Sequence, residues 1–140
     1  MSADNTSLES VLKLTSLHVD QMEYQRIGIP SVESGFSGNF ISEMAINEDG
    51  SRTIRLSLVG ECADYFKIVV RIVGVFIIED ANTNDTDFIE ALFQKNTIAI
   101  MFPFLRSQVS LLTTQPGITP VLLPPMNISQ FFTDESVQLD

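Results

Sequence analysis

The sequence predicts a single α+β domain in which β-strands come first and helical structure follows. Three observations carry this prediction. Apolar and polar residues alternate in four stretches within the first 78 residues, which is the period of a half-buried strand. Turn sequences rich in Gly, Asp and Asn separate the later stretches. The last third is strongly apolar and begins behind residues that favour the N-terminus of a helix.

Composition and charge narrow the possible classes of protein. The chain has 140 residues, of which 44% are hydrophobic and 19% are charged, so we expect one domain with a modest core. Its formal net charge of −10 argues against a nucleic-acid partner, whose phosphates would repel it. Cys62 and His18 each stand alone in the sequence. They therefore leave no disulfide framework and no zinc ligand set, and we expect no metal or cofactor.

The N-terminus and the hydropathy predict a cytoplasmic protein. The opening residues, MSADNTSLES, are polar and acidic, and they lack the basic start and apolar run of a secretory signal. No segment reaches the ~18 uninterrupted apolar residues of a membrane span, so we expect no membrane insertion. We expect residues 1–10 to form a flexible tail, residues 11–132 the domain, and residues 133–140 an acidic tail.

The first predicted strand covers residues 12–24 and contains irregularities. Its apolar residues alternate, but the phase of the alternation slips twice. In a strand, such a slip usually marks a β-bulge or a twist. Residues 26–39 then mix Gly, Pro and Ser with Ile27, Ile29, Val32 and Phe36, which predicts a long loop that carries apolar side chains.

Three further strands are predicted before residue 79. The second begins at Phe40 and ends in the turn sequence NEDGS, where Gly50 is free to take a positive φ. The third covers residues 54–58, and the sequence ECAD turns the chain after it. The fourth, residues 65–78, is the longest. Both of its faces are largely apolar near its end, so we expect that end to be covered on both sides.

A helix with little charge is predicted in the last third of the chain. It should begin at about Asp87, behind residues that can cap its N-terminus. Residues 92–132 contain no acidic side chain, and their only charges are Lys95 and Arg106. Pro103 should kink the helix or start a second one, and the sequence TTQPG should end it.

This helix is too apolar for an ordinary surface helix. Every residue from Ile98 to Leu105 is apolar, whereas a surface helix keeps a polar stripe. A small domain has little room to surround such a helix, so we expect a second copy of the chain to cover its outer side. The alternative is a helix buried entirely within one subunit. The residues expected at the interface between copies are Ile98, Met101, Phe102, Phe104, Leu105 and Val109.

Two short motifs in this region carry a resemblance to a known family. The first is FPFLR, Phe102 to Arg106, an aromatic-Pro-aromatic-x-Arg pattern inside the predicted helix. The second is PVLLPPMNI, Pro120 to Ile128, which reads Pro-x-x-Leu-x-Pro-x-Asn followed by an apolar residue. The second motif starts fourteen residues after the first ends. At this spacing the pair resembles the C-terminal signature of the SecB family of protein-export chaperones.

The resemblance implies a fold, an assembly and a function. The family's fold is a four-stranded antiparallel sheet packed against C-terminal helices, which agrees with the order of elements predicted above. In the family, two subunits pair, and two such dimers meet through their long helices to form a tetramer. The implied function is that of an ATP-independent cytosolic holdase. It would bind unfolded preproteins, keep them competent for translocation by the Sec export pathway, and work with the SecA motor ATPase.

A holdase needs a groove of flexible apolar side chains, and an accessible strand edge helps it to bind an unfolded backbone. The loop after the first strand offers apolar side chains of this kind. The segment bounded by Pro120 and Pro124 offers more, because its prolines keep it extended. The alternative is that all these side chains belong to an ordinary core. The candidate groove residues are Ile27, Ile29, Val32, Phe36, Phe40, Val121, Leu122 and Leu123.

The chain departs from the family at the surface that would dock SecA. In the family, acidic residues on the outer face of the sheet make this contact, but an ungapped placement puts Gln21, Gln25 and Val69 there. Asp20 and Glu23 lie nearby, and a bulge in the strand would make them the docking acids. A second interpretation therefore stays open, namely a SecB-like chaperone dedicated to one client, such as a toxin–antitoxin pair or a phage protein.

Two other classes of protein were considered. Catalysis is not expected, because the sequence has no Gly-rich phosphate loop, no GxSxG motif and no cluster of metal ligands. A structural or assembly protein, held together by the same apolar helix but without a client, stays open as an alternative.

Overall fold

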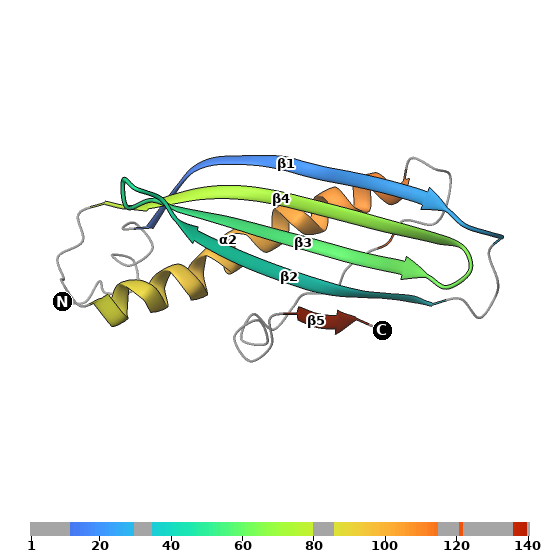
Figure 1. Cartoon of the computed structure of the whole chain (residues 1–140). Helices are drawn as coiled ribbons and strands as arrows, with labels where there is room; N and C mark the ends of the chain where they lie inside the picture. The colour runs from blue at the N-terminus through green and yellow to red at the C-terminus, as the bar shows by residue number, and fades with distance from the viewer. Residues whose placement is uncertain (1–11, 30–34, 80–85, 115–120, 122–135, 140) are drawn as a thin grey trace.

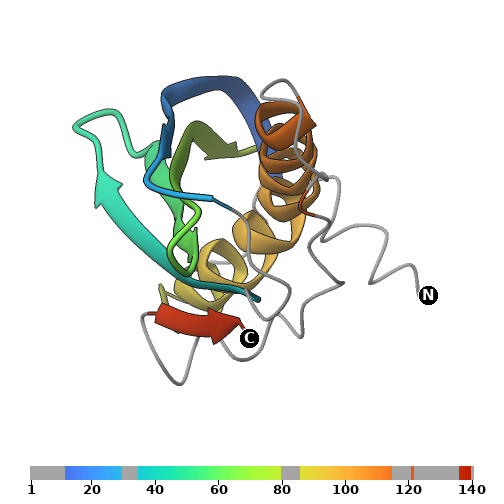
Figure 2. The same cartoon turned by 90° about the vertical axis from the view of Figure 1, so that its right-hand side faces the viewer.

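The computed structural model of the chain describes residues 12–29, 35–79, 86–114, 121 and 136–139. They form an antiparallel sheet with one long helix lying across one of its faces (Figures 1 and 2). The sheet has the strand order β1-β4-β3-β2-β5. The expected α+β fold, with four antiparallel strands packed against a C-terminal helix, is therefore confirmed. The elements are β1 (Leu12–Arg26), β2 (Phe36–Ile46), β3 (Arg52–Cys62), β4 (Phe66–Ile78), α2 (Thr86–Thr114) and β5 (Ser136–Leu139).

β1 contains two bulges where it pairs with β4. Its register against β4 shifts at Thr15 and again at Asp20, where one residue of β1 has no partner on β4. At the first bulge, Thr15 Oγ1 donates a hydrogen bond of 3.0 Å to the carbonyl oxygen of Val75. The two slips in the sequence pattern correspond to these bulges. Each bulge returns the apolar side chains of β1 to the face of the sheet that the helix covers.

The turn between β2 and β3 follows the predicted hairpin sequence. Asn47 N donates to the carbonyl oxygen of Ser51 over 2.8 Å, and Gly50 takes a φ of 89°. The Asp49 carboxylate accepts hydrogen bonds from Ser51 Oγ at 2.6 Å and from Ser51 N at 2.9 Å. These bonds favour the ionised carboxylate and lower the pKa of Asp49. The turn is therefore fixed by local bonds that the sequence itself supplies.

β1, β2 and β3 are longer than alternation predicted. β2 begins at Phe36 rather than Phe40, and β3 continues to Cys62. Gly38 of β2 pairs with Gly60 of β3, and two residues without side chains interrupt the hydropathy pattern at that point. β5 was not predicted. It lies inside the segment expected to be an acidic tail and pairs with residues 38–41 of β2. Four residues are too few to display a strand's periodicity.

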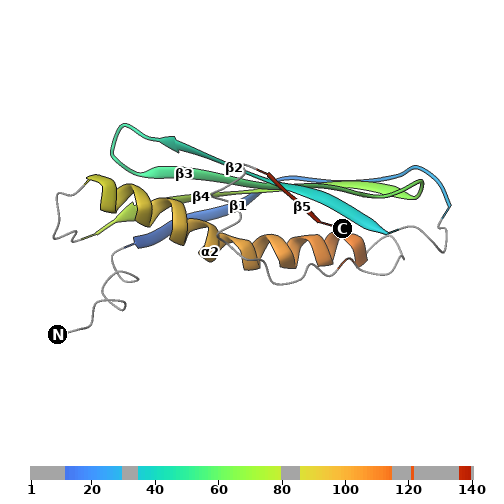
Figure 3. The ribbon, with the colours of Figure 1, turned by 90° about the horizontal axis from the view of Figure 1, so that it is seen from below.

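α2 is one continuous helix of 29 residues that contains Pro103. It bends near its middle (Figure 3), where proline removes one intrahelical hydrogen bond. Two buried hydroxyls on the helix are satisfied within it. Thr97 Oγ1 donates to the carbonyl oxygen of Phe93, and Thr113 Oγ1 donates to that of Val109 over 2.9 Å. Pro103 therefore kinks the helix, and no second helix begins within residues 86–114.

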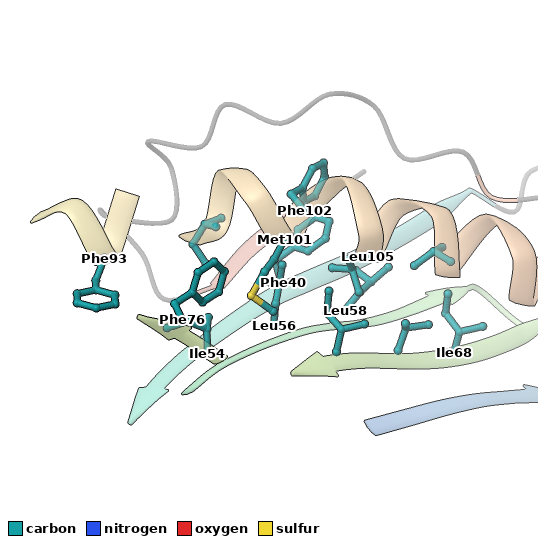
Figure 4. Packing of buried hydrophobic residues seen from close by; sticks show 14 of the residues in the cluster. Phe40, Ile54, Leu56, Leu58, Ile68, Phe76, Phe93, Met101, Phe102 and Leu105 are labelled. Carbon is teal, nitrogen blue, oxygen red and sulfur yellow. The ribbon is translucent and has the colours of Figure 1, made fainter. Parts of the chain in front are cut away.

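The core lies between α2 and the face of the sheet that it crosses (Figure 4). Gly74 on β4 lets the helix approach closely, because a Cβ there would lie only 3.2 Å from Met101 Sδ. The rings of Phe40 and Phe102 meet edge to face with centroids 5.4 Å apart. Large side chains fill this layer completely. Those with almost no exposed surface include Phe40, Leu56, Leu58, Ile68, Val70, Ile72, Phe76, Met101, Leu105 and Val109.

Candidate functional site

Four aromatic rings gather where β1 ends and β4 begins. The ring of Phe66 stacks on Tyr24 with centroids 5.3 Å apart and on Phe36 at 6.4 Å, and Tyr65 meets it edge to face at 5.0 Å. Phe66 is buried, whereas the other three are half-buried. The helix ribbon ends before this tip of the sheet (Figures 1 and 3). We call these four residues the aromatic tip. Its rings keep apolar surface in contact with solvent.

The chain that leaves β1 is anchored at the aromatic tip. The amides of Ile27 and Gly28 both donate to the carbonyl oxygen of Tyr65, over 2.7 and 3.1 Å. Arg26 Nε donates to the carbonyl oxygen of Gly28 at 2.9 Å, and its guanidinium lies 6.0 Å from the centre of the Tyr65 ring. These bonds hold the start of the crossover in place while its side chains stay outside. Ile27 is 43% exposed and Ile29 is 77% exposed.

The absence of a side chain at Gly60 leaves room for the Phe36 ring of the aromatic tip. A Cβ added to Gly60 on β3 would overlap Phe36 Cζ. Phe36 therefore lies flat over the backbone of the neighbouring strand, beside Phe66. A larger residue at position 60 would push the ring away from the sheet.

The Tyr24 phenol and the Cys62 thiol near the tip are neutral at pH 7. Burial raises the pKa of Tyr24 above its ordinary value, Tyr65 adds to this rise, and Arg26 opposes it. Burial also raises the pKa of the Cys62 thiol. The tip consequently offers apolar and aromatic surface to a ligand, without a thiolate or phenolate that would serve as a nucleophile.

The predicted groove residues fall into different environments. Ile27, Ile29 and Phe36 come together at the aromatic tip. Phe40 instead lies fully buried in the core, against Phe102. Val121 is half-buried against the core, and its amide donates to Thr113 Oγ1 over 2.8 Å. The remaining three, Val32, Leu122 and Leu123, lie outside the described residues.

Three members of the aromatic tip were missed as candidate groove residues. Tyr24 occurs at the end of the first strand, whereas Tyr65 and Phe66 occur at the start of the fourth. Nothing local in the sequence connects the two positions. The available signal was the antiparallel pairing of these strands, which places the end of one beside the start of the other once both bulges are counted.

The predicted interface residues divide between the core and the surface. Five of the six have at most 5% of their surface exposed, because they pack on the sheet of the same subunit. Phe104 is the exception, with 46% exposed. It shares the outer side of α2 with the exposed residues Ala99, Pro103 and Leu111. The five buried residues are Ile98, Met101, Phe102, Leu105 and Val109. Any contact with another subunit through this helix would use its outer side.

A hollow of about 340 Å³ lies beside this outer side of the helix. Leu12 at the start of β1 and Asn96, Ala99 and Ile100 on α2 line it. Three of the four side chains are apolar, so the hollow fits an apolar side chain better than a charged one. It continues the apolar surface around Phe104 towards the edge strand β1.

The face of the sheet opposite the helix carries both signs of charge. Glu23 on β1 pairs with Val69 on β4, and the residues on either side of Val69 on that face are Lys67 and Arg71. Asp20 is the unpaired residue of the second bulge. The bulge thus brings Glu23 to the outer face. It lies beside two bases, and Glu61 on β3 pairs with one of them, Lys67, so acids and bases are mixed on this face.

The described part of the chain contains neither a cluster of metal ligands nor a helix that could span a membrane. Among residues 12–29, 35–79, 86–114, 121 and 136–139, no three His, Cys, Asp or Glu side chains come together as metal ligands. Within the same residues, no helix has the length and apolarity that crossing a membrane requires.

Comparison with known families agrees with this geometry. The model of the family described as preprotein translocase subunit SecB matches residues 47–138, about two thirds of the chain. An uncharacterised protein of Methanocaldococcus jannaschii is 29% identical over an alignment of 128 residues that covers 84% of this chain and 80% of that protein. The family match covers β3, β4 and α2 in full and the first three residues of β5.

Solved structures share the fold at low sequence identity. A SecB-like chaperone of Mycobacterium tuberculosis, in complex with a ChAD peptide from an antitoxin, superposes with a TM-score of 0.68 at 12% identity. The match covers 86% of this chain and 95% of that one. A protein of unknown function from Streptococcus agalactiae gives a TM-score of 0.52 at 16% identity, covering 81% and 96% of the two chains.

Proposed function

This chain belongs to the SecB family, and from that premise we propose that it is an ATP-independent holdase for unfolded polypeptides. The observation that carries the proposal is the aromatic tip, where half-buried rings lie beside the exposed side chains of Ile27 and Ile29. Unfolded chains have exposed apolar side chains in common. Burial of one such side chain stabilises a complex by roughly 1.5–3 kcal/mol before ordering costs.

The charge of the chain supports the same function. A formal net charge of −10 attracts basic unfolded segments and raises the rate of encounter, in a manner that salt weakens. The proposal requires no cofactor and no covalent step. We expect the protein to act in the cytoplasm, as copies that associate through the outer side of α2.

We propose preproteins of the Sec export pathway as clients, with SecA as the partner that receives them. A second candidate is a chaperone dedicated to one client. The charge pattern of the outer sheet face favours this second candidate, because the bases Lys67 and Arg71 lie among the acids there rather than beside an acidic patch. The peptide bound to the similar mycobacterial chaperone, which comes from an antitoxin, is consistent with it.

The holdase function is tested by refolding a slow-folding client in the presence of the protein. We expect refolding to be delayed and a complex to form. Combining Phe36→Ala with Ile29→Ser should weaken that complex about tenfold or more, since each removes apolar contact surface. Val59→Ala on the opposite face of the sheet is the matched control, because Val59 is 43% exposed and lies away from the aromatic tip. Undelayed refolding without any complex would overturn the proposal.

The two candidates differ in whether they bind SecA. Binding that is tight and is lost in the Asp20→Ala/Glu23→Ala variant would support the export function. A protein that delays client refolding but does not bind SecA would support the dedicated chaperone.

A further inference from the structure

The two edges of the sheet are protected in different ways. β1, at one edge, carries two bulges, and its charged residues include Lys13, Asp20 and Glu23. Bulges and charges are the devices that keep another strand from pairing with an exposed edge. β1 therefore resists strand addition along much of its length.

β2 lacks these devices. Its register against β3 is continuous, it contains no Lys, Arg or Pro, and Glu43 is its one charged residue. It is covered instead by the protein's own C-terminal strand. Within the residues that the structure describes, β5 pairs with residues 38–41, whereas β2 runs from Phe36 to Ile46. Strand pairing thus masks the middle of an edge that is otherwise suited to accept a strand.

The part of β2 beyond its pairing with β5 is apolar. Beyond β5, Met44 and Ile46 have 38% and 66% of their surface exposed, and by alternation both lie on the helix-facing side. Phe36, at the other end of the same strand, belongs to the aromatic tip. An extended chain along β2 would therefore gain backbone hydrogen bonds from the edge and apolar contacts at both ends.

We propose that the β2 edge is a docking site for an extended segment of client polypeptide, and that β5 occupies part of this site until a client displaces it. The inference rests on the proposed holdase function and adds the position and the mode of binding. β5 shows that the edge accepts an antiparallel strand, since Ser136–Leu139 already pairs with it. A strand of four residues is at the short end for proteins, so its displacement costs little.

Competition of this kind has a measurable consequence. The apparent affinity for a client falls by the fraction of molecules in which the edge is free. If β5 is docked in about nine molecules of ten, undocking it raises the affinity about tenfold. If β5 is locked in place, a client can no longer form backbone hydrogen bonds with the residues of β2 that β5 occupies.

A disulfide lock tests the proposal in the full-length chain. In a Cys62→Ser background, Asn39→Cys/Gln138→Cys introduces cysteines at residues that are Cα partners between β2 and β5. The probe is reduced, carboxamidomethylated ribonuclease A, a basic chain that stays unfolded. We expect the oxidised variant to bind it at least about tenfold more weakly than the same variant after reduction. Lys13→Cys/Ile77→Cys, paired between β1 and β4 at the opposite edge, should bind equally well in both states.

A second variant acts in the opposite direction. Val137 pairs with Phe40, and Val137→Pro removes an amide hydrogen and so weakens β5. We expect affinity for the probe to rise about three- to tenfold, whereas Val137→Thr, which keeps the amide, should leave it unchanged. Equal affinity of the locked and reduced forms, together with no gain in Val137→Pro, would overturn the displaced-strand inference while the reduced protein still binds. Absence of binding in every variant and in the unmodified protein would instead overturn the holdase function itself.

Discussion

Arg52 on β3 is joined to Glu90 in α2 by two parallel hydrogen bonds, Nη1 to Oε1 at 3.0 Å and Nη2 to Oε2 at 2.6 Å. The guanidinium also lies 4.2 Å from the centre of the Phe93 ring. The Arg52 side chain is 9% exposed and that of Glu90 is 39% exposed. This pair connects the first half of the helix to the sheet, at the end of the core opposite the aromatic tip.

We expect Glu90→Ala to destabilise the fold by about 1–3 kcal/mol, because it leaves a buried guanidinium without its carboxylate. The free energy of unfolding in urea measures this loss. Glu43→Ala is the matched control, since Glu43 and Arg55 form an exposed pair at 3.4 Å. Its effect should stay within about 1 kcal/mol. Equal losses in the two variants would show that burial of Arg52 adds nothing to the pair.

The same pair predicts how stability depends on pH. The hydrogen bonds from Arg52 are the main cause of the lowered pKa of Glu90, and burial of the carboxylate opposes them. A pKa that is lower in the folded state contributes stability above the unfolded value of 4.5, and this contribution is lost as the pH falls through the folded value. The stability gap between the unmodified protein and Glu90→Gln should therefore shrink as the pH is lowered from 7 through this range. A gap that stays constant would contradict the assignment. Asp49 also has a lowered pKa, so the comparison of the two proteins is needed to isolate Glu90.

The outer side of α2 predicts the state of association. Phe104→Arg adds a cation to the outer side of α2 and leaves the buried side chains of the core unchanged, because Phe104 is 46% exposed. If copies associate there, a desolvated guanidinium without a partner should lower the mass measured by light scattering at least twofold, with an unchanged circular dichroism spectrum. Val59→Arg, at a comparably exposed site on the opposite face, should leave the mass unaltered. A protein that is already monomeric would contradict association through the helix.

The hydroxyl of Thr113 near the end of α2 binds the amide of Val121. Thr113 Oγ1 accepts a hydrogen bond of 2.8 Å from the amide of Val121 while it donates to the carbonyl oxygen of Val109. Thr113→Val preserves the shape of the buried side chain and removes both bonds. We expect the Val121 amide to exchange its hydrogen faster by about a factor of ten, which corresponds to the loss of roughly one hydrogen bond. Thr114→Val is the control, because Thr114 Oγ1 donates to the carbonyl oxygen of Ser110 within the helix. Unchanged exchange at Val121 would show that other contacts hold it.

The fold was predictable because each strand keeps one face on the helix. Alternation survives wherever this holds, and even the bulges at Thr15 and Asp20 left a visible slip of phase. The helix was predictable from its apolar composition, but the destination of its side chains was not. Ile98 and Leu105 pack against the sheet of their own subunit, so most of the charge-free surface is used within one chain. Composition counts apolar residues without recording which side of a helix they occupy.

The candidate site was only partly predictable. Ile27, Ile29 and Phe36 are apolar residues in a sequence otherwise typical of a loop, and for this reason they were predicted as groove residues. Tyr24 and Phe66 become neighbours through the pairing of two strands that are distant in the sequence. The register of that pairing is set by two bulges. β5 could not be predicted, because four residues are too few to show the alternation typical of a strand that pairs with β2.

The aromatic tip predicts an energetic coupling between Gly60 and Phe36. Gly60→Ala places a methyl group where Phe36 Cζ now lies, and overpacking of this kind costs about 1–3 kcal/mol. Part of this cost should vanish in a Phe36→Ala background, where the ring is absent. A double-mutant cycle in urea should give a coupling of at least about 0.5 kcal/mol.

Gly38→Ala provides the matched control for this cycle, because its added Cβ would meet Leu58 Cδ1 at 3.0 Å and the carbonyl oxygen of Val59 at 3.1 Å rather than the Phe36 ring. Its cost should be the same with and without the Phe36 ring. The coupled pair should also affect binding, since a displaced ring no longer stacks on Phe66. Gly60→Ala should therefore weaken client binding in the unmodified background and have little effect once Phe36 is alanine. Additive losses in both stability and binding would show that the ring does not depend on the bare backbone at Gly60.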